Sequence, residues 1–99
     1  MAIRHVITIP IAAGKAAEFI EAFKAVQVTA LEEEGCEQYE LFQGVDDPDT
    51  MVLLERWTSQ ELLERHMKAE RTRDPSAMEA LMALWAPGVT PTIERFEVG

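Results

Sequence analysis

His66 is the residue of this sequence whose type and position point most directly to chemistry. It follows Leu62 and Leu63 by four and three residues and precedes Met67, so a helix through this segment places its imidazole on an apolar face. An imidazole has an unperturbed pKa near ~6.5, which suits it to proton transfer close to neutral pH. Two interpretations are open: His66 is a catalytic proton acceptor, or it is a structural histidine bonded to a backbone carbonyl or to Glu55.

Three residues on the strands expected before this helix are candidates to bind a substrate. Trp57 and Tyr39 would form flat apolar walls, and the phenol of Tyr39 would add a hydrogen bond. Glu55 would contact the bound molecule or orient His66. The alternatives are that Trp57 anchors the core and that Glu55 is an ion-paired structural acid. Cys36 is expected to be a small buried hydrophobe, because nothing near it in the sequence marks a reactive thiolate.

The sequence carries no signature of a metal site or an organic cofactor. His5, His66 and Cys36 belong to separate expected elements and do not have the spacing of metal ligands. The glycines are too scattered for the GxGxxG loop that binds flavin and nicotinamide dinucleotides; they are Gly14, Gly35, Gly44, Gly88 and Gly99. We therefore expect a protein that works without cofactor or metal.

Apolar and β-branched runs bounded by turn residues predict four strands, over residues 3–11, 36–44, 50–57 and 90–98. A helix over about 14–34 is predicted from an apolar stripe that steps by three and four. The stripe consists of Ala16, Phe19, Ile20, Phe23, Val26 and Ala30. The sequence VDDPD between the second and third strands is typical of a turn, so these two strands should form a hairpin.

Two shorter helices are predicted between the third and fourth strands. Thr58 and Glu61 match a capping box, which would start the helix that carries His66. Asp74 as a cap and Pro75 in the first turn indicate the start of the next helix. Its buried stripe is expected to be Met78, Leu81, Met82 and Trp85.

This order of elements, β-α-β-β-α(α)-β, is that of the ferredoxin-like split βαβ fold. We expect an α+β protein with a four-stranded antiparallel sheet and its helices on one face, as a single domain over residues 1–99. One face of such a sheet should be polar, yet the third strand has Met51 and Leu53 on one face and Val52 and Leu54 on the other. A second copy packed on the uncovered face would explain this pattern, giving a homodimer. Edge strands with mixed patterns are the alternative.

The net charge of −9 argues against a nucleic-acid partner, because an acidic protein repels phosphate groups. The three glutamates at 32–34 are expected to be a solvated helix end that Gly35 terminates. The longest apolar runs are a few residues, too short to cross a membrane, and the first residues lack the pattern of a signal peptide. One cysteine cannot form an internal disulfide, so a cytoplasmic location is expected.

The segment from Gly35 to Glu70 resembles the antibiotic biosynthesis monooxygenase family of dimeric α/β barrels. The resemblance consists of Gly-Cys-x-x-Tyr entering the second strand, Glu-x-Trp closing the third, and a serine-bearing cap before a helix with a histidine. In this sequence those residues are Gly35, Cys36, Tyr39, Glu55, Trp57, Ser59 and His66. This part covers about a third of the chain, and the order of the elements extends the likeness to nearly all of it.

The resemblance implies an oxygenase, because better-understood members oxidise electron-rich phenols and quinols with O2 and without a cofactor, or degrade haem. The haem-degrading members are similar in an asparagine on the first strand and a proximal histidine beyond the short helix. This sequence has no asparagine and no histidine after His66, which disfavours haem degradation. The expected activity is cofactor-independent oxidation of a small aromatic, with His66 as the base. A non-catalytic ligand-binding dimer and an interaction module without a pocket are the alternatives.

Overall fold

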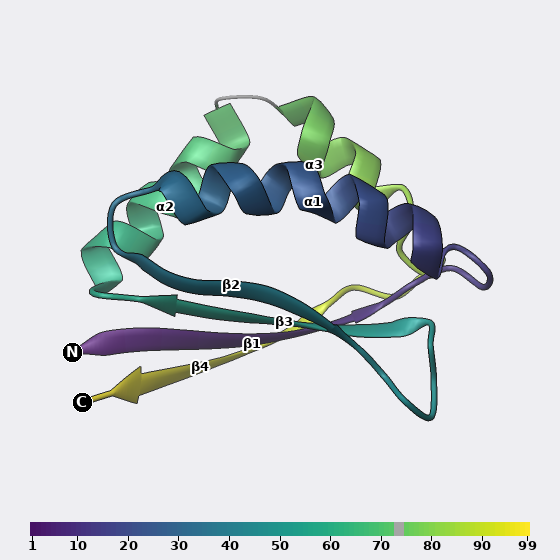
Figure 1. The fold of residues 1–99 in the computed structure, drawn as a ribbon, viewed down its shortest axis with the longest axis horizontal. Helices are drawn as coiled ribbons and strands as arrows, with labels where there is room; N and C mark the ends of the chain where they lie inside the picture. Colours follow the sequence, from purple (N-terminus) through teal and green to yellow (C-terminus); the bar gives the residue numbers. More distant parts are fainter. Residues whose placement is uncertain (73–74) are drawn as a thin grey trace.

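A computed structural model describes residues 1–72 and 75–99 of the chain as one sheet covered by helices (Figure 1). The elements are β1 (Ala2–Pro10), α1 (Ala16–Glu32), β2 (Cys36–Gln43), β3 (Thr50–Trp57), α2 (Gln60–Thr72), α3 (Pro75–Met82) and β4 (Thr92–Val98). The strands pair antiparallel in the order β2-β3-β1-β4. The predicted α+β class and ferredoxin-like arrangement are confirmed.

All three helices lie on the same face of the sheet, with α1 running along its length (Figure 1). The predicted apolar stripe of α1 explains the position of this helix, because Phe19 and Phe23 of the stripe are buried against the strands. They meet a sheet face on which every second residue of β3 is buried; those residues are Met51, Leu53, Glu55 and Trp57. The core therefore lies between the helices and the two central strands, and its buried polar residues in the described part of the chain are His5, Glu55 and His66.

The start of α2 differs from the prediction. Ser59, and not Thr58, caps this helix, because its hydroxyl accepts a hydrogen bond from the backbone N–H of Leu62 at 3.2 Å. Glu61 then lies one position too early to complete a capping box. The predicted cap Asp74 lies outside the described residues. In α3, Leu81 is buried as predicted, whereas Met82 is 48% exposed, so the apolar stripe of α3 is narrower than the sequence indicated.

The turn between β2 and β3 is the predicted hairpin. Asp47 holds it, since its carboxylate accepts hydrogen bonds from the backbone N–H of Asp49 at 3.1 Å and the hydroxyl of Thr50 at 2.8 Å. The hairpin brings β2 alongside β3 with Tyr39 opposite Glu55. This register places the phenol of Tyr39 near the residues that α2 contributes.

The turn from α1 into β2 passes through Gly35, which has a φ of +88°. A Cβ atom at this position would lie 2.5 Å from Cδ1 of Leu62 and 2.9 Å from the hydroxyl of Thr58. Glycine is therefore required both by the backbone conformation and by the close approach of α2. The turn fixes how the end of α1 meets α2.

Replacing Gly35 with alanine should lower the free energy of unfolding by about 2–3 kcal/mol, because a left-handed backbone and a steric clash both oppose the new methyl group. Gly88→Ala is the matched control, since Gly88 has a φ of +75° and open space around it, and it should cost only about 1 kcal/mol. Urea unfolding of the two variants measures the difference. If both variants lose the same free energy of unfolding, the contact between Gly35 and α2 does not constrain the turn.

The face of the sheet opposite the helices is uncovered in the monomer (Figure 1). Phe42 and Phe96, which alternate with residues of the helix-facing side, are each 46% exposed there, and Val52 and Leu54 are half-buried between them. The two-sided apolar pattern of the strands is therefore a property of the folded chain. The helix-facing side of the sheet is the core, and the other side carries partly exposed apolar side chains among charged ones such as Arg4 and Arg56.

Candidate active site

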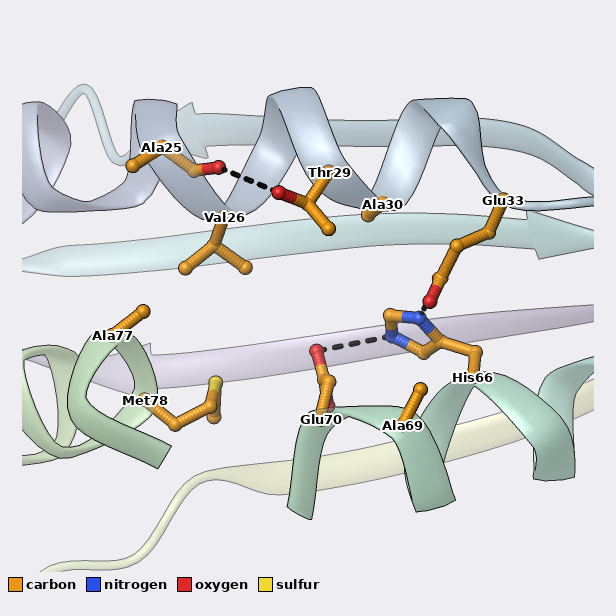
Figure 2. Close-up of a pocket in the computed structure, with 10 residues that line it drawn as sticks. All are labelled: Ala25, Val26, Thr29, Ala30, Glu33, His66, Ala69, Glu70, Ala77 and Met78. Carbon is orange, nitrogen blue, oxygen red and sulfur yellow. Dashed lines mark hydrogen bonds and ion pairs between the residues drawn. The ribbon is translucent and has the colours of Figure 1, made fainter. Parts of the chain in front are cut away.

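The imidazole of His66 lies between two carboxylates (Figure 2). Its Nδ1 forms a hydrogen bond with the carboxylate of Glu33, and its Nε2 is 3.0 Å from Oε1 of Glu70, one helical turn further along α2. The side chain of His66 is 3% exposed, and those of Glu33 and Glu70 are 17% and 23% exposed. Both ring nitrogens are thus engaged by acidic groups in a largely buried setting.

The prediction that residues 32–34 are a solvated helix end is wrong for Glu33, which is largely buried and contacts His66. Glu32 and Glu34 are exposed, but Glu33 follows the last residue of α1 with an extended backbone that directs its side chain to α2. α1 ends at Glu32, so Gly35 does not terminate the helix as predicted but turns the chain towards β2. Of the three glutamates, the middle one belongs to the site.

The two carboxylates decide the charge of His66. Burial alone would lower the pKa of the imidazole, but the hydrogen bonds and negative charges of Glu70 and Glu33 outweigh it and raise the pKa to about 9. His66 is therefore an imidazolium at neutral pH. A catalytic role for His66 stays a prediction, and the geometry changes the form in which the ring would act: as a positive charge rather than as a neutral base.

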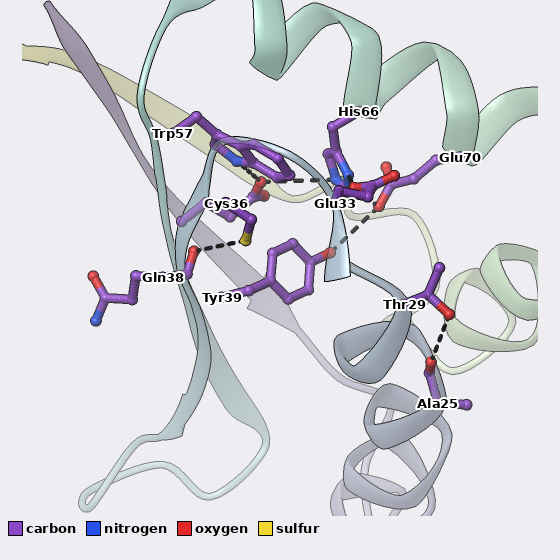
Figure 3. Close-up of polar contacts among 10 residues, drawn as sticks. Ala25, Thr29, Glu33, Cys36, Gln38, Tyr39, Trp57, His66 and Glu70 are labelled. Carbon is purple, nitrogen blue, oxygen red and sulfur yellow. Dashed lines mark hydrogen bonds and ion pairs between the residues drawn. The ribbon is translucent and has the colours of Figure 1, made fainter. Parts of the chain in front are cut away.

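The indole of Trp57 lies beside the imidazole of His66 (Figure 3). The indole ring of Trp57 is fully buried and packs on His66 with ring centroids 4.4 Å apart, a contact that favours a cationic imidazole. The indole N–H of Trp57 donates to Oε1 of Glu55 at 2.9 Å, and the same oxygen is 3.9 Å from Nε2 of His66. Burial raises the pKa of Glu55.

Tyr39 joins the cluster from β2. Its hydroxyl donates to Oε1 of Glu70 at 3.3 Å (Figure 3). Its ring stacks on Phe23 with centroids 5.6 Å apart. Burial and the charges of Glu70 and Glu55 raise the pKa of the phenol, so Tyr39 stays neutral. The thiol of Cys36 is also protonated at neutral pH, because burial raises its pKa to about 11.

A cavity of about 410 Å³ opens between this cluster and the helices. Its polar lining includes His5, Tyr39, Glu55, His66 and Glu70, and its apolar lining includes Phe19, Phe23, Leu53, Trp85 and Ile93. The volume lies in the lower part of the range of ~300–1,000 Å³ that is usual for small-molecule sites. Tyr39 and Glu55 thus reach the cavity, whereas Trp57 lies beneath His66 and does not line it.

A second, smaller cavity of about 270 Å³ lies between α1 and the other two helices (Figure 2). Alanines and Met78 form much of its lining, and His66 and Glu70 belong to both cavities. The His66–Glu70 pair therefore stands between the two spaces. No group of histidine, cysteine, aspartate and glutamate side chains within residues 1–72 and 75–99 is arranged to hold a metal ion.

The sequence interpretation missed three residues of this site: Glu33, Glu70 and His5. Glu70 was detectable, since it lies four residues after His66 and a helix places such pairs on one face. His5 was detectable too, since Ile3, His5, Ile7 and Ile9 alternate on one face of β1. Glu33 could not be found, because its contact with His66 joins segments 33 residues apart.

The model of the antibiotic biosynthesis monooxygenase family matches residues 2–78, more than three quarters of the sequence. The chain belongs to the antibiotic biosynthesis monooxygenase family. The match includes β1 to α2 and the beginning of α3, and so the ionisable residues that line the cavity. A search of curated proteins finds no match.

Solved structures share the fold of this chain. A conserved protein from Methanosarcina mazei Go1 is 24% identical with a TM-score of 0.84, over 97% of this chain and 91% of the other. A mutant of SnoaB, a cofactor-independent oxygenase from Streptomyces nogalater, is 20% identical with a TM-score of 0.82, over 98% and 92% of the two chains. PA3566 from Pseudomonas aeruginosa is 25% identical with a TM-score of 0.79, over 96% and 91%. No helix among the described residues of this chain is long and apolar enough to span a membrane.

Proposed function

We propose that this protein is a cofactor-independent monooxygenase that oxidises a small electron-rich aromatic, of the phenol or quinol type, with O2. The observation that carries the proposal is the 410 Å³ cavity, in which aromatic and aliphatic side chains face a cluster of ionisable groups. Membership of the antibiotic biosynthesis monooxygenase family and the fold shared with the oxygenase SnoaB support it.

The cavity suits a flat aromatic ring. Phe19, Phe23 and Trp85 offer apolar contact to the ring. The neutral phenol of Tyr39 orients the carboxylate of Glu70 through its hydrogen bond to this group. Apolar walls also exclude water from the reacting atoms, which strengthens the electrostatic effect of nearby charges. The protein need only hold the ring, remove a proton and stabilise the anion.

The chemistry balances without a cofactor. Loss of the phenolic proton leaves the O–H electron pair on the phenolate oxygen, from which it is delocalised into the ring. The electron-rich anion then reduces O2, and a ring carbon bonds to one of the two oxygen atoms. The ring then loses water and becomes a quinone, so the aromatic and O2 give the quinone and one H2O. One oxygen atom of O2 enters the product, and the substrate itself supplies the two electrons that reduce the other.

His66 would act in this scheme through its charge. Its imidazolium lies at the cavity wall and partly offsets the carboxylates of Glu55 and Glu70, which line the same cavity and would otherwise oppose a phenolate there. A preorganised positive charge that faces a developing anion lowers the barrier to its formation. Trp57, packed on the ring of His66, holds that charge in place.

Oxygen uptake with a panel of small dihydroxyaromatics tests the proposal, using the purified protein with no added cofactor. Under 18O2 the product should gain one labelled oxygen atom, and the second should appear in water. Tight binding of a panel member with no oxygen uptake would instead support the non-catalytic ligand-binding protein. If no panel member binds and none supports oxygen uptake, the proposed substrate class is refuted.

We also propose that the protein is a cytoplasmic homodimer, with the uncovered sheet faces of two copies packed together. Phe42, Val52, Leu54 and Phe96 would lie at the centre of that interface, which would remove their apolar surface from water. The single cysteine is in keeping with a reducing compartment.

Light scattering during gel filtration should give twice the chain mass for the wild-type protein and about the chain mass for Val52→Asp. A carboxylate at the centre of a sheet-to-sheet interface would be buried without a partner, and this should weaken dimerisation at least about 100-fold. Val28→Asp is the matched control, because Val28 is 60% exposed on α1, on the opposite side of the molecule, and the variant should stay dimeric. A monomeric wild type at all concentrations would refute the dimer.

A further inference from the structure

His5 lies at the centre of the sheet on the side that faces the helices. In the register of the strands it stands between Glu55 of β3 and Arg95 of β4. It is 8% exposed and lines the 410 Å³ cavity together with His66. The cavity thus has two imidazoles in its wall, one from β1 and one from α2.

The two imidazoles differ in their hydrogen bonds. Both nitrogens of His66 are engaged by carboxylates, whereas the ring of His5 makes no hydrogen bond within residues 1–72 and 75–99. In the same part of the chain, no side-chain nitrogen or oxygen that is fully shielded from solvent lacks a hydrogen-bond partner. The nitrogens of His5 are therefore not enclosed by protein atoms, and the space that this ring lines is the cavity. A nearly buried polar group left open to a cavity is positioned to bond to a ligand.

The charges around His5 favour its neutral form. Burial, the guanidinium of Arg95 and the imidazolium of His66 all lower the pKa of His5 below its ordinary value of 6.5. Other ionisable groups that line the same cavity are Glu55 on β3, Tyr39 on β2 and Glu70 on α2. α1 and α3 contribute apolar side chains to this cavity. At neutral pH His5 has a free lone pair, which His66 lacks.

We propose that His5 is the proton acceptor of the site, taking the phenolic proton of an aromatic bound in the cavity while His66 stabilises the anion. In this step the O–H bond breaks, its electron pair stays on the phenolate oxygen, and the proton bonds to a ring nitrogen of His5. The product is a phenolate beside two imidazolium rings. The assignment rests on the proposed function for its substrate class, but proton transfer can be measured without turnover.

4-Nitrophenol is a suitable probe, because its neutral and ionised forms absorb at different wavelengths. We expect the probe bound to wild-type protein to ionise at a pH lower by about one unit or more than the probe bound to His5→Gln, since an opposite charge within hydrogen-bond distance shifts a pKa by this amount. Nuclear magnetic resonance of 15N-labelled wild-type protein gives an independent measurement. At pH 7 the ring of His5 should be neutral without the probe and protonated when the probe is bound.

The wild-type measurement keeps the proposal testable if His5→Gln folds poorly. The proposal is overturned if 4-nitrophenol does not bind, if the His5 ring stays neutral in the complex, or if the bound probe ionises equally in both proteins. Oxygen uptake separates this inference from the proposed function. Proton transfer to His5 without turnover would refute the oxygenase and leave the proton acceptor intact. Turnover that survives in His5→Gln within tenfold would refute the proton acceptor and leave the oxygenase intact.

Discussion

Replacing His66 with glutamine is expected to slow oxygen uptake about 10²–10³-fold, the usual effect of removing a group that stabilises charge in a transition state. Glutamine is close to histidine in size and keeps a hydrogen-bonding group, but it has no charge. Glu55 and Glu70 would then line the cavity without an imidazolium beside them and oppose the phenolate. The measurement is the initial rate under saturating aromatic, below the melting temperature of both proteins.

The matched control is Glu64→Gln, which lies two residues earlier on the same helix and is exposed. It changes charge by one unit as well, and it should leave the rate within about twofold because water screens an exposed group. The pH dependence of the wild-type rate distinguishes the roles of His66. A stabilising imidazolium predicts a rate that falls as the pH rises through about 9, whereas a base at His66 predicts a rate that rises there. Full activity in His66→Gln with a lower melting temperature would make His66 a structural residue.

Raising the pH from about 6.5 to about 9 is expected to lower the free energy of unfolding by up to about 3 kcal/mol. The pKa of His66 is raised to about 9 in the folded protein from 6.5 in the unfolded chain. Below pH 6.5 both states bind the proton and the stabilisation is complete. Between the two values only the folded state binds it, so the stabilisation falls with pH and is lost above pH 9. Urea unfolding at several pH values and a fixed protein concentration measures the slope.

The contributions of other ionisable groups begin to change at other pH values. The pKa of His5 is lowered, so its contribution to stability is lost as the pH falls below 6.5. The pKa of Glu55 is raised from 4.5 by burial, so its contribution to the free energy of unfolding begins to fall as the pH rises above 4.5. The pKa of Cys36 is raised from 9.0 to about 11, so its contribution falls above pH 9. In His66→Gln the slope between pH 6.5 and 9 should largely disappear, and an unchanged slope would show that the Glu33–His66–Glu70 cluster does not stabilise the fold.

The chemistry that we propose for the site depends on the difference between its two histidines. One is held charged by two carboxylates, and the other is held neutral by burial and by neighbouring cations. An environment that separates the pKa values of two like groups prepares one as a base and the other as a fixed charge. The acidic composition of the chain contributes to this arrangement through Glu33 and Glu70, two of its 18 acidic residues.

Local patterns in the sequence were enough to predict the elements and their faces. The period of about 3.6 in α1 identified Phe19 and Phe23 as core residues, and the turn residues after β2 identified the hairpin that aligns Tyr39 with Glu55. The same periodicity placed His66 on the inner face of α2. These features depend on residues a few positions apart, and backbone geometry fixes their relative directions.

The protonation states and the cavity were decided only by the tertiary structure. The sequence suggested Glu55 as the partner of His66, but the turn at Gly35 brings Glu33 to one ring nitrogen and the helix brings Glu70 to the other. It suggested Trp57 as a cavity wall, but Trp85, from the segment after α3, lines the cavity instead. A pKa depends on burial and on every charge within a few ångströms, whichever part of the chain supplies it. Sequence periodicity gives the direction of a side chain from its own element, whereas the packing of α1, α2 and the sheet determines what that side chain meets.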